Sequence, residues 1–138
     1  MVEPYILSVF WGDFTNQEIE ALEENVACYE RAIYEEFNAS FAIDAQFHQM
    51  LANKCTNRYL LQMYNAMSVR DRRRMVFTGI ENVKRAGETL SEHRAIINAV
   101  KEKDNKKAGK MMEQHIERAY QDTMKKVMSK EMRLEIPL

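Results

Sequence analysis

The sequence contains few of the residues that break helices or build disulfides. It has four glycines, two prolines and two cysteines in 138 residues, and Pro4 and Pro137 both lie near its ends. Helix-forming residues dominate the rest, and no clear alternation of apolar and polar residues marks a strand. The composition therefore predicts an all-α fold. Cys28 and Cys55 are too few for a disulfide framework and indicate reduced thiols in the cytoplasm.

The sequence also lacks a long apolar run and an excess of either charge. No segment is apolar over the ~20 residues needed to cross a bilayer, and the first residues do not have the pattern of a signal peptide. The 20 Lys and Arg residues are balanced by 21 Asp and Glu residues, for a formal net charge of -1. Phosphate binding needs a concentrated basic surface. We therefore expect a cytoplasmic protein that binds no membrane and does not by itself bind nucleic acid.

The apolar spacing predicts a single domain over residues 1–138, folded as an antiparallel bundle of about six helices. Thr15 and Glu18 have the spacing of a capping box, which marks the start of the second helix. Breaks are expected at Gly12–Thr15 and Asn38–Ser40, and an irregular or frayed tail from about Lys130 to Leu138. The expected helices cover residues 3–11, Thr15 to about Phe37, Phe41 to about Lys54, Thr56 or Asn57 to a point between Gly79 and Gly87, Ser91 or nearer Gly87 to the turn at Lys103–Asn105, and from there to about Lys130.

The third expected helix carries a carboxylate and an imidazole on its apolar face. Asp44 and His48 are four residues apart, so their side chains project to the same side about one helical turn apart. They share this stripe with Phe41, Ala45 and Leu51. A carboxylate that points into a helical core is costly unless a positive group meets it there. The pattern therefore predicts a cationic partner for Asp44.

The two other histidines of the chain also fall on inward-facing stripes. His93 shares its stripe with Ile96 and Val100. His115 lies on the last helix beside Met112. Two ligands at i and i+4, with two more from other helices, would build a metal site inside a bundle. Three imidazoles and one carboxylate suit Zn, Ni, Fe, Mn or Co and do not suit Ca or Mg.

Spacing alone leaves two alternatives to a metal. Arg74, or another member of the run Arg70–Arg74, could pair with Asp44 as a buried ion pair. Each histidine could also be a hydrogen-bonded core residue, which would make the chain a structural interaction bundle. Most of the arginine run is typical of a solvated helix surface, and Arg74 is the candidate for pairing with an anionic ligand.

Few features of the sequence indicate an enzyme. A metallohydrolase usually needs a base close to the metal-bound water, and Glu92 and Glu113 are both expected to point away from the core face. The sequence has no His-Asp dipeptide, no Glu-x-x-His pair, no glycine-rich phosphate loop and no recognisable nucleophile. A metal-dependent hydrolase on a helical bundle is kept as an alternative function.

Four segments of the chain together resemble one known family. Their order, spacing and apolar frame are similar to the FadR C-terminal (FCD) effector domain of GntR-family bacterial transcription regulators, in its smaller, VanR-like branch. The patterns D-x-x-F-H, E-H-x-x-I and M-x-x-H-I carry the resemblance, which extends from about Val2 to Met128. The segments are Asp44-x-x-x-His48 within Phe41–Leu51, Thr56-Asn57, Ser91–Asp104 and Ala108–Ile116.

The resemblance implies a helical bundle around a central cavity that holds one divalent metal. Its ligands would be Asp44, His48, His93 and His115, with zinc the first candidate and nickel, manganese, iron or cobalt the others. It also implies a small organic or sugar acid effector at the open positions of the metal.

The resemblance further implies a homodimer whose geometry responds to the effector. Arg74, Asn57 and Tyr64 are the candidate effector contacts. Family members carry a winged helix-turn-helix domain before the effector domain, and we expect that this sequence contains none. It is therefore expected to reach DNA only through such a missing N-terminal domain.

Overall fold

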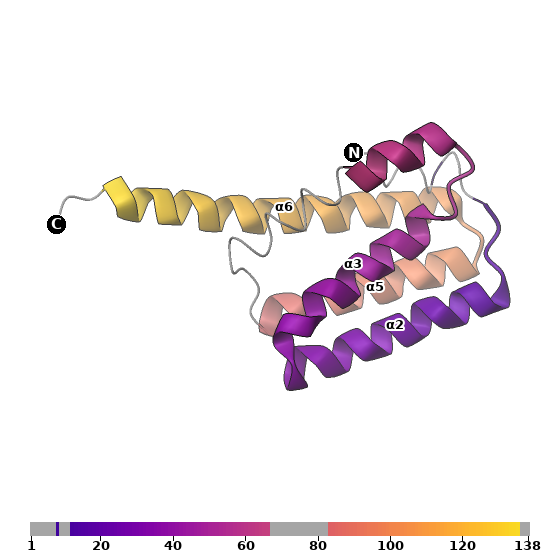
Figure 1. Cartoon of the computed structure of the whole chain (residues 1–138), viewed down its shortest axis with the longest axis horizontal. Helices are drawn as coiled ribbons and strands as arrows, with labels where there is room; N and C mark the ends of the chain where they lie inside the picture. The colour runs from indigo at the N-terminus through magenta and orange to yellow at the C-terminus, as the bar shows by residue number, and fades with distance from the viewer. Residues whose placement is uncertain (1–7, 9–11, 67–82, 136–138) are drawn as a thin grey trace.

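The computed structural model of the chain describes residue 8 and residues 12–66 and 83–135. Within these ranges the regular structure is helical and contains no strand, which confirms the predicted all-α class. The helices are α2 (Asn16–Glu35), α3 (Phe37–Ala52), α5 (Val83–Lys101) and α6 (Asn105–Glu135), with a further helical segment over residues 58–66 (Figure 1). The first expected helix lies outside the described residues except for Ser8, which is helical.

Helix α2 begins with the predicted capping box. The Thr15 hydroxyl accepts a hydrogen bond from the Glu18 backbone N–H (3.1 Å), and the Thr15 N–H donates to Glu18 Oε1 (2.8 Å). These two bonds satisfy backbone and side-chain groups that a helix start otherwise leaves to water. Glu18 Oε1 also accepts from Lys54 Nζ at 3.0 Å, which ties the start of α2 to the chain just after α3. The buried face of α2 includes Leu22, Val26, Tyr29 and Ile33.

The link between α2 and α3 differs from the expectation. The predicted break at Asn38–Ser40 is wrong, since α3 already begins at Phe37. Glu36 alone reverses the chain, with φ −151° and ψ 73°, while its N–H still bonds to the Ala32 carbonyl at 2.9 Å. The Ser40 hydroxyl donates to the Phe37 carbonyl at 2.6 Å, so its hydrogen-bonding need is met inside the helix and it does not end it.

The helical segment over residues 58–66 starts where the sequence predicted. Asn57 Oδ1 accepts from the backbone N–H groups of Tyr59 (3.0 Å) and Leu60 (3.3 Å), which makes Asn57 the N-cap. The predicted course of this helix beyond residue 66 lies outside the described residues, and Arg74 lies there with it.

Helices α5 and α6 are both longer than expected. α5 is already helical at Val83, before both Ser91 and Gly87, because Ala86 and Leu90 continue its buried stripe into the earlier turns. The turn after it is confirmed, and Asp104 Oδ1 caps α6 by accepting from the Lys107 N–H at 3.1 Å. The irregular tail predicted from about Lys130 is wrong as far as Glu135, where α6 ends. No glycine or proline precedes Pro137 in this stretch, so nothing in the sequence stops the helix earlier.

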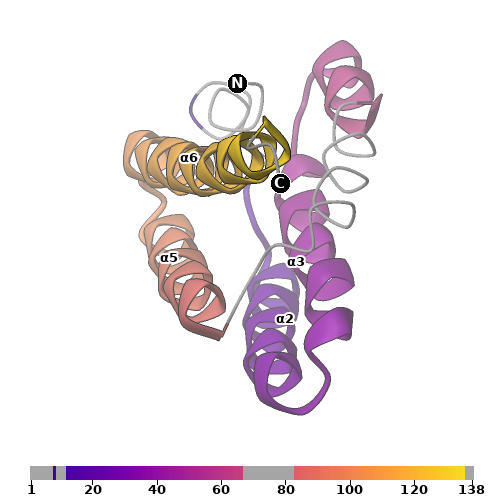
Figure 2. The ribbon, with the colours of Figure 1, turned by 90° about the vertical axis from the view of Figure 1, so that its left-hand side faces the viewer.

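Helices α2 and α3 run in opposite directions, as do α5 and α6, whereas α3 and α5, which the helical segment over residues 58–66 separates in the chain, run in the same direction (Figure 1). Among the described helices, α2 packs closely with α3 and with α5, and α5 packs closely with α6. Figure 2 shows α3 and α5 on either side of α2, with α6 passing above them. The C-terminal half of α6 extends past the other helices (Figure 1). None of the described helices has the length and apolar character to cross a bilayer.

Candidate metal centre

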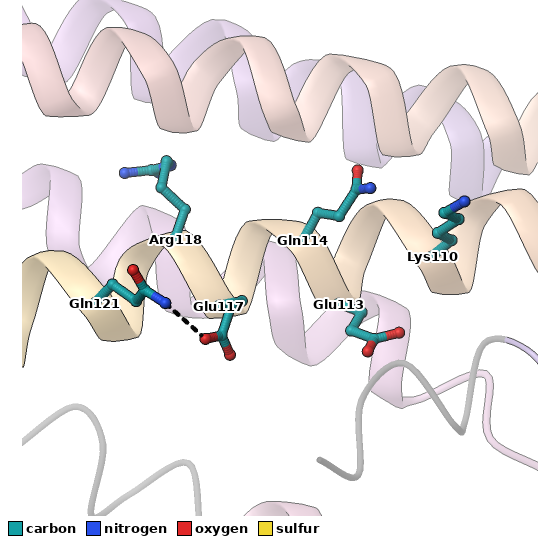
Figure 3. A pocket seen from close by; sticks show the side chains of 6 residues that line it. All are labelled: Lys110, Glu113, Gln114, Glu117, Arg118 and Gln121. Carbon is teal, nitrogen blue, oxygen red and sulfur yellow. Dashed lines mark hydrogen bonds between the residues drawn. The ribbon is translucent and has the colours of Figure 1, made fainter.

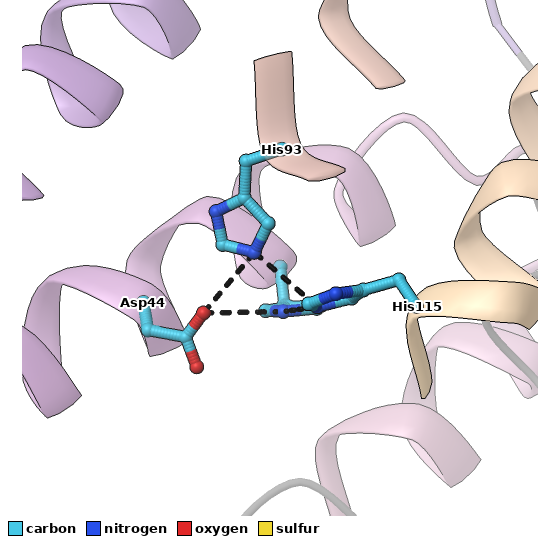
Figure 4. Close-up of side chains that lie close together, drawn as sticks. Asp44, His93 and His115 are labelled. Atoms are coloured by element: carbon cyan, nitrogen blue, oxygen red, sulfur yellow. Dashed lines mark hydrogen bonds and ion pairs between the residues drawn. The ribbon is translucent and has the colours of Figure 1, made fainter. Parts of the chain in front are cut away.

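Three helices direct the four predicted ligands to one point. Asp44 and His48 come from α3, His93 from α5 and His115 from α6. Each offers one ligand atom, and these four atoms all lie within 4.8 Å of one another. Figure 4 shows Asp44, His93 and His115 pointing toward a common centre. The structure therefore brings together the residues that the sequence analysis selected from separate segments.

The distances between the ligand atoms fit a single small cation. Asp44 Oδ1 lies 3.2 Å from His93 Nε2 and 3.4 Å from His48 Nε2. His115 Nε2 lies 3.3 Å from His93 Nε2 and 3.4 Å from His48 Nε2. Two ligand atoms that bind the same zinc-sized ion at about 2.1 Å, with angles between octahedral and tetrahedral, are separated by roughly 3.0–3.4 Å. The adjacent pairs of the cluster have this separation.

Hydrogen bonds among the described residues do not account for all buried polar atoms of the cluster. Asp44 Oδ1 and His93 Nδ1 are both buried and have no hydrogen-bond partner there. Asp44 Oδ1 is close to two imidazole rings, but neither contact has hydrogen-bond geometry. Burying an ionised oxygen without a directed donor is costly. A cation between Asp44 Oδ1 and the three Nε2 atoms would meet this need, so the residues fit a metal.

The electrostatics of two of the four ligands, Asp44 and His93, favour the protonation states that a metal needs. Burial raises the pKa of the Asp44 carboxyl, but the neighbouring His48 and His93 rings outweigh this effect and hold the pKa well below its usual range. Burial lowers the pKa of His93 to about 4, although Asp44 opposes the shift. At neutral pH Asp44 is therefore anionic and His93 neutral. Metal binding requires deprotonated ligands.

An aromatic stack positions His93 between α3 and α5. Its fully buried ring lies nearly parallel to the Phe47 ring, with centroids 3.9 Å apart and an interplanar angle of 8°. The Tyr29 ring of α2 lies 5.9 Å away on a tilted plane. Such contacts restrict the rotation of the imidazole without using either ring nitrogen.

A family model and one solved structure match the chain. The model of the FCD domain matches residues 1–118. The chain belongs to the FCD family. FCD domains bind effectors and form dimers in GntR-family transcription regulators, so the role of this domain is regulatory and not enzymatic. A search of curated proteins found no match.

The solved structure supports the FCD fold. A structure described as Streptococcus agalactiae GntR matches with a TM-score of 0.68 and 24% sequence identity, over 83% of this chain and 50% of that one. The present FCD domain therefore aligns with half the length of that protein.

Glu92 contradicts one expectation from the sequence. It was predicted to point away from the core face, yet its carboxylate lies against His115, with Oε1 3.0 Å from Nδ1. Arg118 holds the same carboxylate, with Nε 2.8 Å from Oε1 and 2.9 Å from Oε2. The spacing of His115 and Arg118 at i and i+3 was the available signal for this arrangement. Glu113 is exposed, as predicted.

Two of the three candidate effector contacts of this FCD domain have structural roles in the fold, and the third lies outside the described residues. Asn57 uses its side-chain carbonyl as a helix cap. Tyr64 is buried against Ala52, in a small apolar cluster separate from the main core. Arg74 is outside the described residues, so its pairing with Asp44 or with an anion stays a prediction. The effector roles of Asn57 and Tyr64 also stay predictions.

An open groove of about 550 Å³ follows one side of α6 (Figure 3). It carries charges of both signs, and its Arg118 side chain is already engaged by Glu92 and Asp122. The groove is therefore not the central cavity that the FCD resemblance implied, and that cavity stays a prediction. The lining residues are Lys110, Glu113, Gln114, Glu117, Arg118 and Gln121.

Proposed function

We propose that this FCD domain binds one divalent transition metal and uses it to hold a small organic or sugar acid, within a homodimeric cytoplasmic regulator. Asp44, His48, His93 and His115 would be the protein ligands. The observation that carries this proposal is the convergence of four ligand atoms from three helices within 4.8 Å of one another. The donor set of three imidazoles and one carboxylate favours zinc, nickel, manganese, iron or cobalt.

The accessible side of the cluster indicates where an effector would approach. The His93 side chain is fully buried and that of His115 is 5% exposed, whereas those of Asp44 and His48 are 18% and 15% exposed. The side of the cluster formed by α3 is therefore the less buried one, and we propose that the effector approaches there. The bound metal would supply Lewis-acid attraction for an effector carboxylate. The four ligand atoms lie within 4.8 Å of one another, and opposite ligands of an octahedral shell are ~4.2 Å apart. The cluster is therefore also compatible with an octahedral shell, in which positions would stay open for the effector.

The metal would also join helices that do not pack closely. Among the described helices α3 and α6 are not a closely packed pair, yet His48 Nε2 and His115 Nε2 lie 3.4 Å apart. A shared ion would connect them directly. An effector that binds one dimer arrangement better than another would shift the equilibrium between the two, and in this family the readout is DNA affinity. We propose that this domain senses and dimerises and that a winged helix-turn-helix domain contacts the DNA.

The first test is elemental analysis of protein purified without added metal or chelator. We expect about one transition metal per chain, lost in His48→Ala and retained in Glu113→Gln, an exposed carboxylate near His115 that serves as the control. Wild-type protein without metal, with a melting temperature unchanged by excess chelator, would instead support a structural bundle with core histidines.

A second test addresses the effector. Small organic and sugar acids would be screened by thermal shift on metal-loaded and metal-stripped protein. We expect stabilisation of the loaded protein alone, because the carboxylate would bind through the metal. An equal shift in both forms would show that the effector site does not use the metal.

A further inference from the structure

Of the two buried histidines of the cluster, one has an outer carboxylate partner among the described residues and the other does not. His115 Nδ1 lies 3.0 Å from Glu92 Oε1, whereas His93 Nδ1 has no hydrogen-bond partner there. An ionised carboxylate can only accept, so a neutral His115 places its proton on Nδ1. This leaves the Nε2 lone pair facing His93 and His48, at the centre of the cluster.

The Glu92 carboxylate is itself fixed in place. Arg118 Nε donates to both of its oxygens, at 2.8 Å to Oε1 and 2.9 Å to Oε2. Because a guanidinium has only N–H donors, both Glu92 oxygens act as acceptors in this contact. The position of Glu92 relative to His115 is set by a planar, two-point contact that resists rotation.

Arg118 is held by residues of both α5 and α6. It donates to Thr89 Oγ1 of α5 at 3.0 Å and to Asp122 Oδ2 of α6 at 2.8 Å. Asp122 Oδ1 in turn lies 2.6 Å from Arg85 Nη1 of α5. This Arg118 network therefore joins the two helices. Through Glu92 it reaches Nδ1 of His115, whose other ring nitrogen, Nε2, faces the proposed metal.

We infer that Glu92 is a positioning residue for the metal site, acting through His115, and that Arg118 holds Glu92 in place. The inference rests on the proposed metal function. Outer carboxylates of this kind set the tautomer and orientation of a ligating histidine and increase its basicity. The network also links metal affinity to the packing of α5 against α6. His93 lacks such a partner among the described residues and is oriented by its stack on Phe47.

The test compares zinc affinity in Glu92→Gln and wild-type protein, measured by competition with a chelator on folded samples. Removing the carboxylate charge is expected to weaken zinc binding by about 10–100-fold. Glu88→Gln is the matched control. Glu88 also contacts Arg118, with Oε2 3.5 Å from Nη1, but the carboxylate of the network that contacts His115 is that of Glu92. Equal zinc affinity in Glu92→Gln and wild type would overturn the inference and leave the proposed function standing.

Two further measurements separate positioning from a general structural effect. In a His115→Ala background, Glu92→Gln should cause no additional loss of zinc affinity, because the residue through which it acts is gone. A full additional loss would contradict action through His115. Nitrogen-detected NMR of metal-free wild-type protein should show His115 protonated at Nδ1, with Nε2–H appearing in Glu92→Gln. An Nε2–H tautomer in wild type would overturn the inference without any metal measurement.

The two hypotheses fail in different ways. If wild-type protein binds no zinc or other transition metal, the proposed function fails and the inference falls with it. If wild type binds zinc and Glu92→Gln binds it equally well, the inference alone is wrong. Circular dichroism and melting curves of each variant would show that the compared samples are folded.

Discussion

Removal of the metal should loosen α3 from the rest of the bundle. In the proposed site α3 supplies two ligands, Asp44 and His48, and α5 and α6 supply one each. The closely packed helix pairs do not include α3 with α6. Stripping the ion would leave an anionic Asp44 among imidazole rings, with no directed donor at its buried oxygen. We therefore expect lower global stability and a larger local effect in α3.

The expected magnitude follows from binding linkage. An ion present at a thousand times its dissociation constant stabilises the folded state by about 4 kcal/mol. For a domain of this size, 1 kcal/mol changes the melting temperature by roughly 3–5 °C. Excess chelator should therefore lower the melting temperature by on the order of 10–20 °C, by an amount that increases with the metal concentration before chelation.

Two assays would measure this change. Calorimetry or circular dichroism with and without chelator gives the global loss of stability. Amide hydrogen exchange on the same samples locates it, and we expect exchange to increase more in α3 than in α2 or α5. His48→Ala should melt like stripped wild type and show little response to chelator, because it has already lost its metal. Restoring zinc to stripped wild type should reverse both changes.

Two results would refute this reasoning. An unchanged melting temperature in excess chelator would mean that no ion stabilises the cluster. A uniform increase in exchange over α2, α3, α5 and α6 would mean that the ion stabilises the fold without specifically holding α3.

Three further predictions concern the surrounding structure. Phe47→Ala should destabilise the domain by about 3–5 kcal/mol in urea unfolding, because Phe47 is fully buried. It should also weaken zinc binding, because the Phe47 ring stacks on His93. An unchanged zinc affinity would contradict the positioning role of the stack. The pKa of Glu18 is lowered by hydrogen bonds from the Thr15 backbone and from Lys54, so its contribution is present above its unfolded pKa and is lost as the pH falls below it. The stability difference between wild type and Glu18→Gln should thus shrink from pH 7 to pH 3, and a constant difference would contradict this. Gly87→Ala should stabilise α5 by roughly 0.5–1 kcal/mol, because alanine loses less conformational entropy than glycine in a helix and a Cβ at this position meets nothing within 4 Å. A lower urea midpoint for the variant would contradict this prediction.

Local sequence patterns were sufficient where the physical cause is local. The capping box at Thr15 and the cap at Asn57 form between residues a few positions apart. The Thr15–Glu18 spacing predicted the first of these helix starts, and the second was predicted at Thr56 or Asn57. The link at Glu36 was missed because Asn38–Ser40 has the composition of a turn, while the reversal takes place at one residue of ordinary helical preference. The length of α6 was missed because helix formers continue to Glu135, and no local signal distinguishes a frayed end from a continued one.

The sequence by itself determined the helical class and the four candidate ligands. Their positions on apolar stripes follow from the helical period, which depends only on spacing along the chain. Tertiary structure alone decided that the four ligand atoms meet within 4.8 Å and that Glu92 contacts His115 and Arg118. Glu92 lies next to the apolar stripe of α5 and not on it. Its carboxylate reaches His115 and Arg118 only because α6 packs against that side of α5. Distances between helices depend on how their faces pack, and helical periodicity carries no information about them.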